Sequence, residues 1–123
     1  MCTGPMKIKW APEVDKDDFP AAEAYLSLIF DKVDALKLVR KLKKAPLEEF
    51  AAKDILRASR LPLDTSSDSL TAEKQKVEQG KHLSPILLVR HERTGTVIIA
   101  DGYHRVCVTC LFAEDAKVPA KIV

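Results

Sequence analysis

The spacing of apolar and polar residues predicts helices in the first half of the chain. Between residues 20 and 45 the apolar positions recur at helical spacing, which predicts a long helix beginning near Pro20. Asp34 is placed to cap a second helix, which would divide this run in two. We expect the buried stripe of the run to consist of Tyr25, Ile29, Val33, Leu36 and Val39, widened by Leu26 and Phe30.

The middle of the chain alternates helical patterns with breaks. A shorter helix is expected to open at Pro46, because two glutamates follow in its first turn and apolar residues recur after them. A polar loop over residues 64–69 comes next. Asp68 or Ser69 is placed to cap a further helix, which would stop at Gly80.

Strand patterns dominate the last third of the chain. Ile86–Arg90 and Thr96–Ala100 are β-branched and apolar, and the loop 92–95 between them fits an antiparallel hairpin. Residues 118–123 predict a closing strand, and residues 6–10 predict a short first one. The helix after the hairpin is expected to bury Val106, Cys107, Cys110 and Leu111. Together these patterns predict an α+β fold, a small mixed sheet with packed helices.

A candidate anion site lies where the second hairpin strand meets the last helix. An Asp-Gly turn, Asp101-Gly102, joins the two, and His104 and Arg105 fall in the first helical turn. Free amides and the positive end of the helix dipole attract anions, and glycine permits close approach, so a phosphate group suits this position. The alternative is a plain corner, with Asp101 capping the helix and both cations solvated.

Four segments in this order resemble the ParB and sulfiredoxin superfamily. They are the Pro-Ile strand Ser84–Arg90, the hairpin glycine Gly95, the motif Asp101–Arg105 and the closing strand Val118–Val123. The resemblance implies a small domain of mixed strands and helices with a phosphate motif at a helix N-terminus. It is consistent with a single domain, residues 1–123. In that domain a helical N-terminal elaboration (residues 1–63) precedes the core (residues 64–123).

Departures from the superfamily pattern narrow the expected activity. Sulfiredoxins carry a catalytic cysteine between the Gly and the His of the motif, where this chain has Tyr103. The ParB partition proteins carry Gly-Glu-Arg-Arg there, followed by a DNA-binding domain that would begin where this chain ends. We therefore expect neither sulfinic acid reduction nor autonomous DNA partitioning. The motif is most similar to the Asp-Gly-His-Thr-Arg of ParB-like free serine kinases.

The resemblance implies a ligand, either ATP or CTP or a phosphorylated small molecule. The expected binding residues are Gly102, Tyr103, His104 and Arg105, and the Arg105 side chain is expected to project from the core and to contribute most. The helix over residues 68–80 has an equivalent in sulfiredoxin-like proteins that contacts nucleotide phosphates. By that equivalence Thr71 and Lys74 join the site, although a solvated surface helix explains either residue alone.

Asp101 and His104 are the candidate catalytic residues of a phosphotransferase or nucleotide hydrolase. A carboxylate beside bound phosphates is repulsive unless it holds a cation or a proton, so Asp101 would bind Mg²⁺ or accept a proton from the substrate. Two alternatives stay open. One is a nucleic-acid-binding or nuclease-like ParB module, and the other is a regulatory partner without catalytic activity.

Composition limits the remaining partners. The chain has 123 residues, 46% of them hydrophobic, which is typical of one globular domain. Its net charge of +2 does not favour a nucleic-acid coat. The strongest basic cluster is either a solvated helix end or a contact with an acidic partner or nucleic acid. It consists of Arg40, Lys41, Lys43 and Lys44.

The cysteines and the apolar runs bear on location and metals. No run approaches the length needed to span a bilayer, and the first five residues lack the pattern of a secretory signal, so we expect a cytoplasmic protein without membrane contact. Cys107 and Cys110 form a C-x-x-C pair, but they fall inside a helix, which favours core packing over redox chemistry. Zinc would need a second pair, so no structural metal is expected. The sequence leaves the oligomeric state open.

Overall fold

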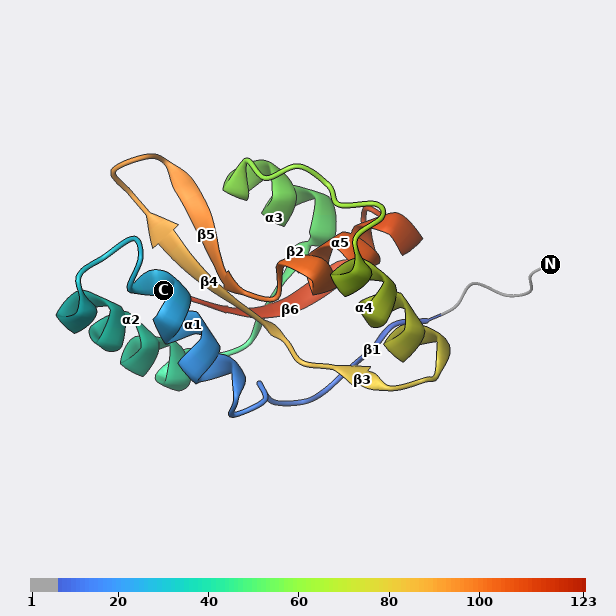
Figure 1. Cartoon of the computed structure of the whole chain (residues 1–123), viewed down its shortest axis with the longest axis horizontal. Coiled ribbons are helices and arrows are strands. Elements are labelled where there is room, and N and C mark those ends of the chain that lie inside the picture. The colour runs from blue at the N-terminus through green and yellow to red at the C-terminus, as the bar shows by residue number, and fades with distance from the viewer. Residues whose placement is uncertain (1–6) are drawn as a thin grey trace.

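The computed structural model describes residues 7–123, which form an α+β fold with five helices and two sheets (Figure 1). The expected fold class is therefore confirmed at the level of a small α+β protein. The elements are β1 (Lys9–Trp10), α1 (Asp18–Leu26), α2 (Lys32–Lys44), β2 (Glu48–Ala51), α3 (Ala52–Ser59), α4 (Asp68–Glu78), β3 (His82–Leu83), β4 (Ile86–His91), β5 (Thr96–Asp101), α5 (Tyr103–Phe112) and β6 (Lys117–Ile122).

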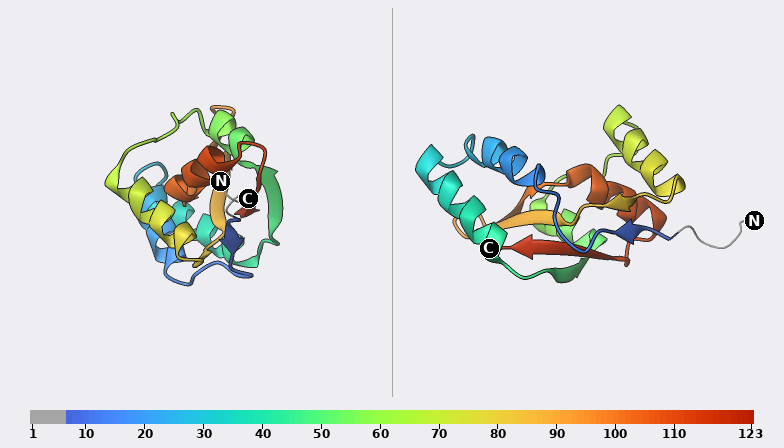
Figure 2. Two further views of the ribbon diagram at one scale, coloured as in Figure 1. Left: turned by 90° about the vertical axis from the view of Figure 1, so that its right-hand side faces the viewer. Right: turned by 90° about the horizontal axis from the view of Figure 1, so that it is seen from below.

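The main sheet has four strands in the order β2-β6-β4-β5. β4 pairs antiparallel with β5 and parallel with β6, and β6 pairs antiparallel with β2. The short strands β1 and β3 form a separate parallel pair. The right-hand view of Figure 2 shows α1 and α2 at one end of the molecule and α4 near the other. The predicted hairpin and the predicted closing strand are both confirmed.

Strand β4 organises the core because both of its faces are buried. Alternate side chains of a strand point to opposite faces. Ile86 and Leu88 enter the cluster formed with α3, α4 and α5, whereas Leu87 and Val89 enter the cluster formed with α1 and α2. All four are at most 2% exposed. The continuous apolar run of β4 is thus explained by helices on both sides of the sheet.

The predicted long helix is two helices, and the cap assigned to the second was wrong. α1 ends at Leu26, and α2 begins after Asp31, whose side chain accepts a hydrogen bond of 2.8 Å from the backbone N–H of Asp34. Asp34 therefore lies inside the first turn of α2, and its backbone N–H donates to the N-cap residue Asp31. Asp31 has the extended backbone and the spacing to the third helical residue that an N-cap requires.

The buried face of these two helices also differs from the expected stripe. Leu26 and Val39 of that stripe are buried, whereas Tyr25 is 44% exposed and Val33 is 63% exposed. The break between the helices resets the helical phase, so one stripe does not continue across it. Small residues mediate the close packing on the sheet, and they carry little weight in a hydrophobic pattern. The buried residues are Ala22, Leu26, Ala35, Val39 and Leu42.

Residues 48–51 form β2, so the prediction of a helix opening at Pro46 was wrong. The segment pairs with β6 from Glu48 opposite Ala120 to Ala51 opposite Lys117, and α3 begins only at Ala52. Pairing with a strand 66 to 72 residues later in the chain overrides the local helical preference, as tertiary contacts commonly do. The sheet consequently includes a strand from the first 63 residues.

Smaller corrections concern caps and ends. The N-cap of α4 is Ser67, whose side chain accepts a hydrogen bond from the N–H of Leu70, in place of the two residues that we expected. Leu111 is 39% exposed, because it lies on the solvent side of α5. β1 covers Lys9–Trp10 of the predicted first strand, and Met6 lies outside the described residues.

Candidate functional site

The Asp-Gly turn lies between a strand and a helix, as the sequence predicts. Asp101 is the last residue of β5, and Gly102 is the N-cap of α5 with a φ of 108°. A Cβ at this glycine would lie 2.5 Å from Cδ1 of Ile86, so both the backbone angle and the contact require glycine. No side chain caps α5, which contradicts the alternative that Asp101 does so.

Arg105 is held by two carboxylates instead of projecting from the core. Its Nη2 donates to Oδ2 of Asp101 at 2.7 Å and lies 3.3 Å from Oδ2 of Asp18 in α1. The Arg105 side chain is only 13% exposed. Our expectation of a projecting guanidinium was therefore wrong. The basic side chain of the motif joins α5 to β5 and to α1.

This network continues from Asp18 into the loop before α1. Ser84 donates its hydroxyl to Oδ2 of Asp18 at 2.6 Å, and the same hydroxyl oxygen accepts from the N–H of Asp15 at 2.9 Å. Nε of Arg105 is buried without a hydrogen-bond partner among residues 7–123. The Arg105 guanidinium thus pairs with two partly buried carboxylates, and its Nε donor remains without a partner among the described residues.

The charge balance of this network changes the protonation of Asp101. Burial raises the pKa of the Asp101 carboxyl, and the neighbouring Asp18 carboxyl adds to that rise. Arg105 opposes both through its charge and its hydrogen bond, but the pKa remains above its ordinary value. The neutral form of Asp101 is consequently more accessible than that of a solvated aspartate.

Tyr103 and His104 anchor the start of α5 to the segment that precedes α4. The hydroxyl of Tyr103 donates to the backbone carbonyl of Pro62, and burial is the main cause that raises the pKa of Tyr103 to about 12. Nε2 of His104 lies 3.3 Å from Oδ2 of Asp64. A hydrogen bond from Ser67 lowers the pKa of Asp64, which keeps this carboxylate charged beside the imidazole.

An open cleft of about 560 Å³ lies at the N-terminus of α5. Its volume is within the range of small-molecule sites. Most of the wall is apolar, and the polar groups gather where β5 ends. The lining residues are Ala21, Tyr25, Leu61, Pro62, Ile99, Ala100, Asp101, Gly102, Tyr103 and His104. Four of the residues that the sequence singled out therefore meet at one cleft.

The two candidates from α4 are not part of this wall. Thr71 is exposed, and its hydroxyl donates to the backbone carbonyl of Ser67 at 3.1 Å. Lys74 is half-buried and does not line the cleft. In contrast, Asp18 and Asp64 contact the motif from distant segments, and sequence reasoning missed both of them. In the sequence, each of these residues is simply an aspartate near the start of a helix. Helix capping and the helix dipole already explain an aspartate at such a position, so the sequence offers no reason to assign either residue to the site.

The cysteines and possible metal ligands add no chemistry to the cleft. Cys107 is buried and Cys110 is partly buried, and both are free thiols. Burial raises the pKa of Cys110. Within residues 7–123 no group of three His, Cys, Asp or Glu side chains is placed to hold a metal ion. No helix in that range is long and apolar enough to cross a membrane.

Comparisons of the chain with known protein families, curated proteins and solved structures gave no match.

Proposed function

We propose that this domain binds the phosphate group of a nucleotide, such as ATP or CTP, or of a phosphorylated small molecule. The observation that carries the proposal is the uncapped N-terminus of α5, which opens onto a cleft of about 560 Å³. The first amides of a helix have no acceptor within the helix, and the dipole there favours an anion. Gly102 supplies the positive φ with which the chain turns from β5 into α5.

The backbone, with His104, provides the binding groups in this proposal, and Arg105 has another role. Its guanidinium is already shared between Asp101 and Asp18, so it holds the motif in shape and compensates the carboxylates. A phosphate at the cleft would face the amides of the first turn of α5 and the half-exposed imidazole of His104. The similarity of the motif to that of ParB-like free serine kinases also supports the proposal that this site binds phosphate.

The raised pKa of Asp101 affects how strongly an anion can bind beside this carboxyl. A charged carboxylate beside a phosphate is repulsive, and protonation of Asp101 removes that repulsion. Mg²⁺ does not fit between Asp101 and Asp18 as they stand, because Arg105 already occupies the position between them. Binding is therefore expected to strengthen as the pH falls through the pKa of Asp101, without any requirement for Mg²⁺.

Phosphotransfer is a second candidate function, favoured by the same carboxyl. A general base works best when its pKa lies near the working pH, and burial moves Asp101 in that direction. Asp101 would accept the proton of an attacking hydroxyl, while the α5 amides and His104 would stabilise charge on the phosphoryl oxygens. Release of phosphate from ATP or CTP, measured with and without Asp101→Asn, tests this candidate.

Calorimetry with ATP, CTP and inorganic phosphate tests the binding proposal. We expect wild-type protein to bind at least one of them at millimolar concentration, and Asp101→Asn to bind it several-fold more tightly near pH 7. The matched control is Glu92→Gln, which removes one negative charge from the exposed hairpin loop and should leave affinity unchanged. Absence of binding by both wild type and Asp101→Asn would reject the proposal. If Glu92→Gln raised the affinity for the ligand as much as Asp101→Asn does, the effect of Asp101→Asn would be due to net charge alone.

A further inference from the structure

Helix α2 carries a concentration of positive charge that no ion pair within the described residues neutralises. It contains six basic residues and one acidic residue, a net charge of +5 in a chain whose total is +2. The remainder of the chain is therefore net −3. All six basic residues are exposed, and none forms an ion pair within residues 7–123.

Four of these residues lie on the outer side of the helix. The buried residues Ala35, Val39 and Leu42 define the side that packs on the sheet. At 100° per residue, the opposite side carries the set that we name the basic face. It consists of Lys37, Arg40, Lys41 and Lys44.

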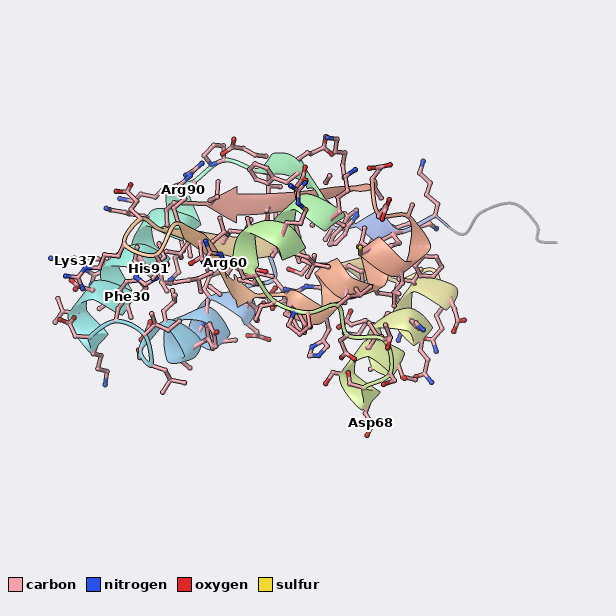
Figure 3. All side chains as sticks on the ribbon, turned by 90° about the horizontal axis from the view of Figure 1, so that it is seen from above. Phe30, Lys37, Arg60, Asp68, Arg90 and His91 are labelled. Carbon is pink, nitrogen blue, oxygen red and sulfur yellow. The ribbon has the colours of Figure 1, made fainter. Side chains whose placement is uncertain are left out.

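The spacing of the cations within the basic face places like charges next to each other, which destabilises the helix when no partner is bound. Lys37 and Lys41 are four residues apart, as are Arg40 and Lys44, so like charges are neighbours on the helix surface. Arg90 adds a further exposed cation at the same end of the molecule, where the labelled side chains of Lys37 and Arg90 are seen (Figure 3). Asp68 lies toward the opposite end. The net charge of +5 on this one helix favours a polyanionic partner.

We propose that the basic face binds the phosphate backbone of a nucleic acid. The face extends over eight residues, about 10 Å from the first Cα to the last, so its cations form a row that suits successive phosphates. A second copy of the chain would present the same positive charge and be repelled. The exposed apolar residues Leu28 and Val33 precede the face and do not interrupt it. The proposal is independent of the cleft at α5.

Fluorescence anisotropy with a labelled DNA duplex of about 20 base pairs, and with its single strand, tests this surface. We expect a dissociation constant of about 10⁻⁴ to 10⁻⁶ M at about 150 mM salt, and tighter binding at about 50 mM salt. For four phosphate contacts on the duplex, the logarithm of the association constant should fall against the logarithm of salt concentration with a slope of about −3.6.

Paired variants locate the interaction. Lys37→Gln with Lys41→Gln should weaken binding at least about tenfold and reduce the magnitude of the slope by about 2. The matched control, Lys81→Gln with Lys117→Gln, removes two exposed lysines from other elements and should retain wild-type affinity. Circular dichroism should give the same helical signal for every variant.

Three results would overturn the proposal. One is absence of binding to either probe at about 50 mM salt. Another is an equal loss in the control pair, which would show attraction by net charge alone. The third is binding to phosphatidylserine vesicles that exceeds binding to DNA and is lost in Leu28→Ser with Val33→Ser, because that would identify an apolar, lipid-facing surface.

Discussion

Replacing Arg105 by methionine should destabilise the whole domain, and this is the most direct test of the network around the motif. The substitution keeps most of the side-chain length but removes the charge shared by Asp101 and Asp18. These carboxylates are 21% and 16% exposed, so neither is well solvated. Removing one partner of a fully buried ion pair costs about 3–5 kcal/mol. The residual exposure points to the lower end, about 3 kcal/mol.

The loss should depend on pH with a definite sign. Arg105 lowers the pKa of Asp101, so in Arg105→Met that pKa rises further. A group whose folded pKa lies above its unfolded value stabilises the fold fully below the unfolded pKa, and this stabilisation is lost as the pH rises through the folded pKa. The variant should therefore be least stable relative to wild type near neutral pH, and the difference should shrink toward about pH 4.

Urea unfolding followed by the fluorescence of Trp10, the one tryptophan of the chain, measures this difference. A loss of about 3 kcal/mol corresponds to a fall of about 12 °C in Tm for a domain of this size. Arg93→Met, in the exposed hairpin loop, is the control and should change stability by less than about 0.5 kcal/mol. A variant within that margin of wild type at neutral pH, or a loss that stays constant down to about pH 4, would refute the reasoning.

Two further substitutions and one measurement of thiol reactivity provide additional tests. Gly102→Ala should cost about 2–4 kcal/mol in urea unfolding, because the φ of 108° strains any side chain and the new Cβ meets Ile86; unchanged stability would mean that the turn relaxes freely. Tyr103→Phe should cost about 1 kcal/mol through the lost hydrogen bond to Pro62, and a loss below about 0.3 kcal/mol would indicate that this bond contributes nothing. In a Cys2→Ser background, the partly buried thiol of Cys110 should react with a thiol reagent more slowly near pH 7 than free cysteine does, since burial raises its pKa; equal rates would contradict that environment.

The sequence by itself determined the elements whose signals are local. The hairpin from Ile86 to Asp101 follows from two β-branched runs around a short loop, and the start of α5 follows from the Asp-Gly turn. Gly80 marks the end of α4 with a positive φ, as the pattern predicts. These features depend on backbone preferences of neighbouring residues, which a single sequence contains.

Tertiary structure decided which faces pack and which charges meet. Residues 48–51 are a strand because β6 offers hydrogen-bond partners, and the pattern of large apolar residues did not reveal that Ala22 and Ala35 are buried. Asp18 reaches Arg105 only because α1 packs against β5, the strand that leads into α5. Ion pairs between distant segments leave no periodicity in a sequence, since any exposed aspartate has the same local signal. The motif was therefore predictable from the sequence, but its electrostatic partners were set by the fold.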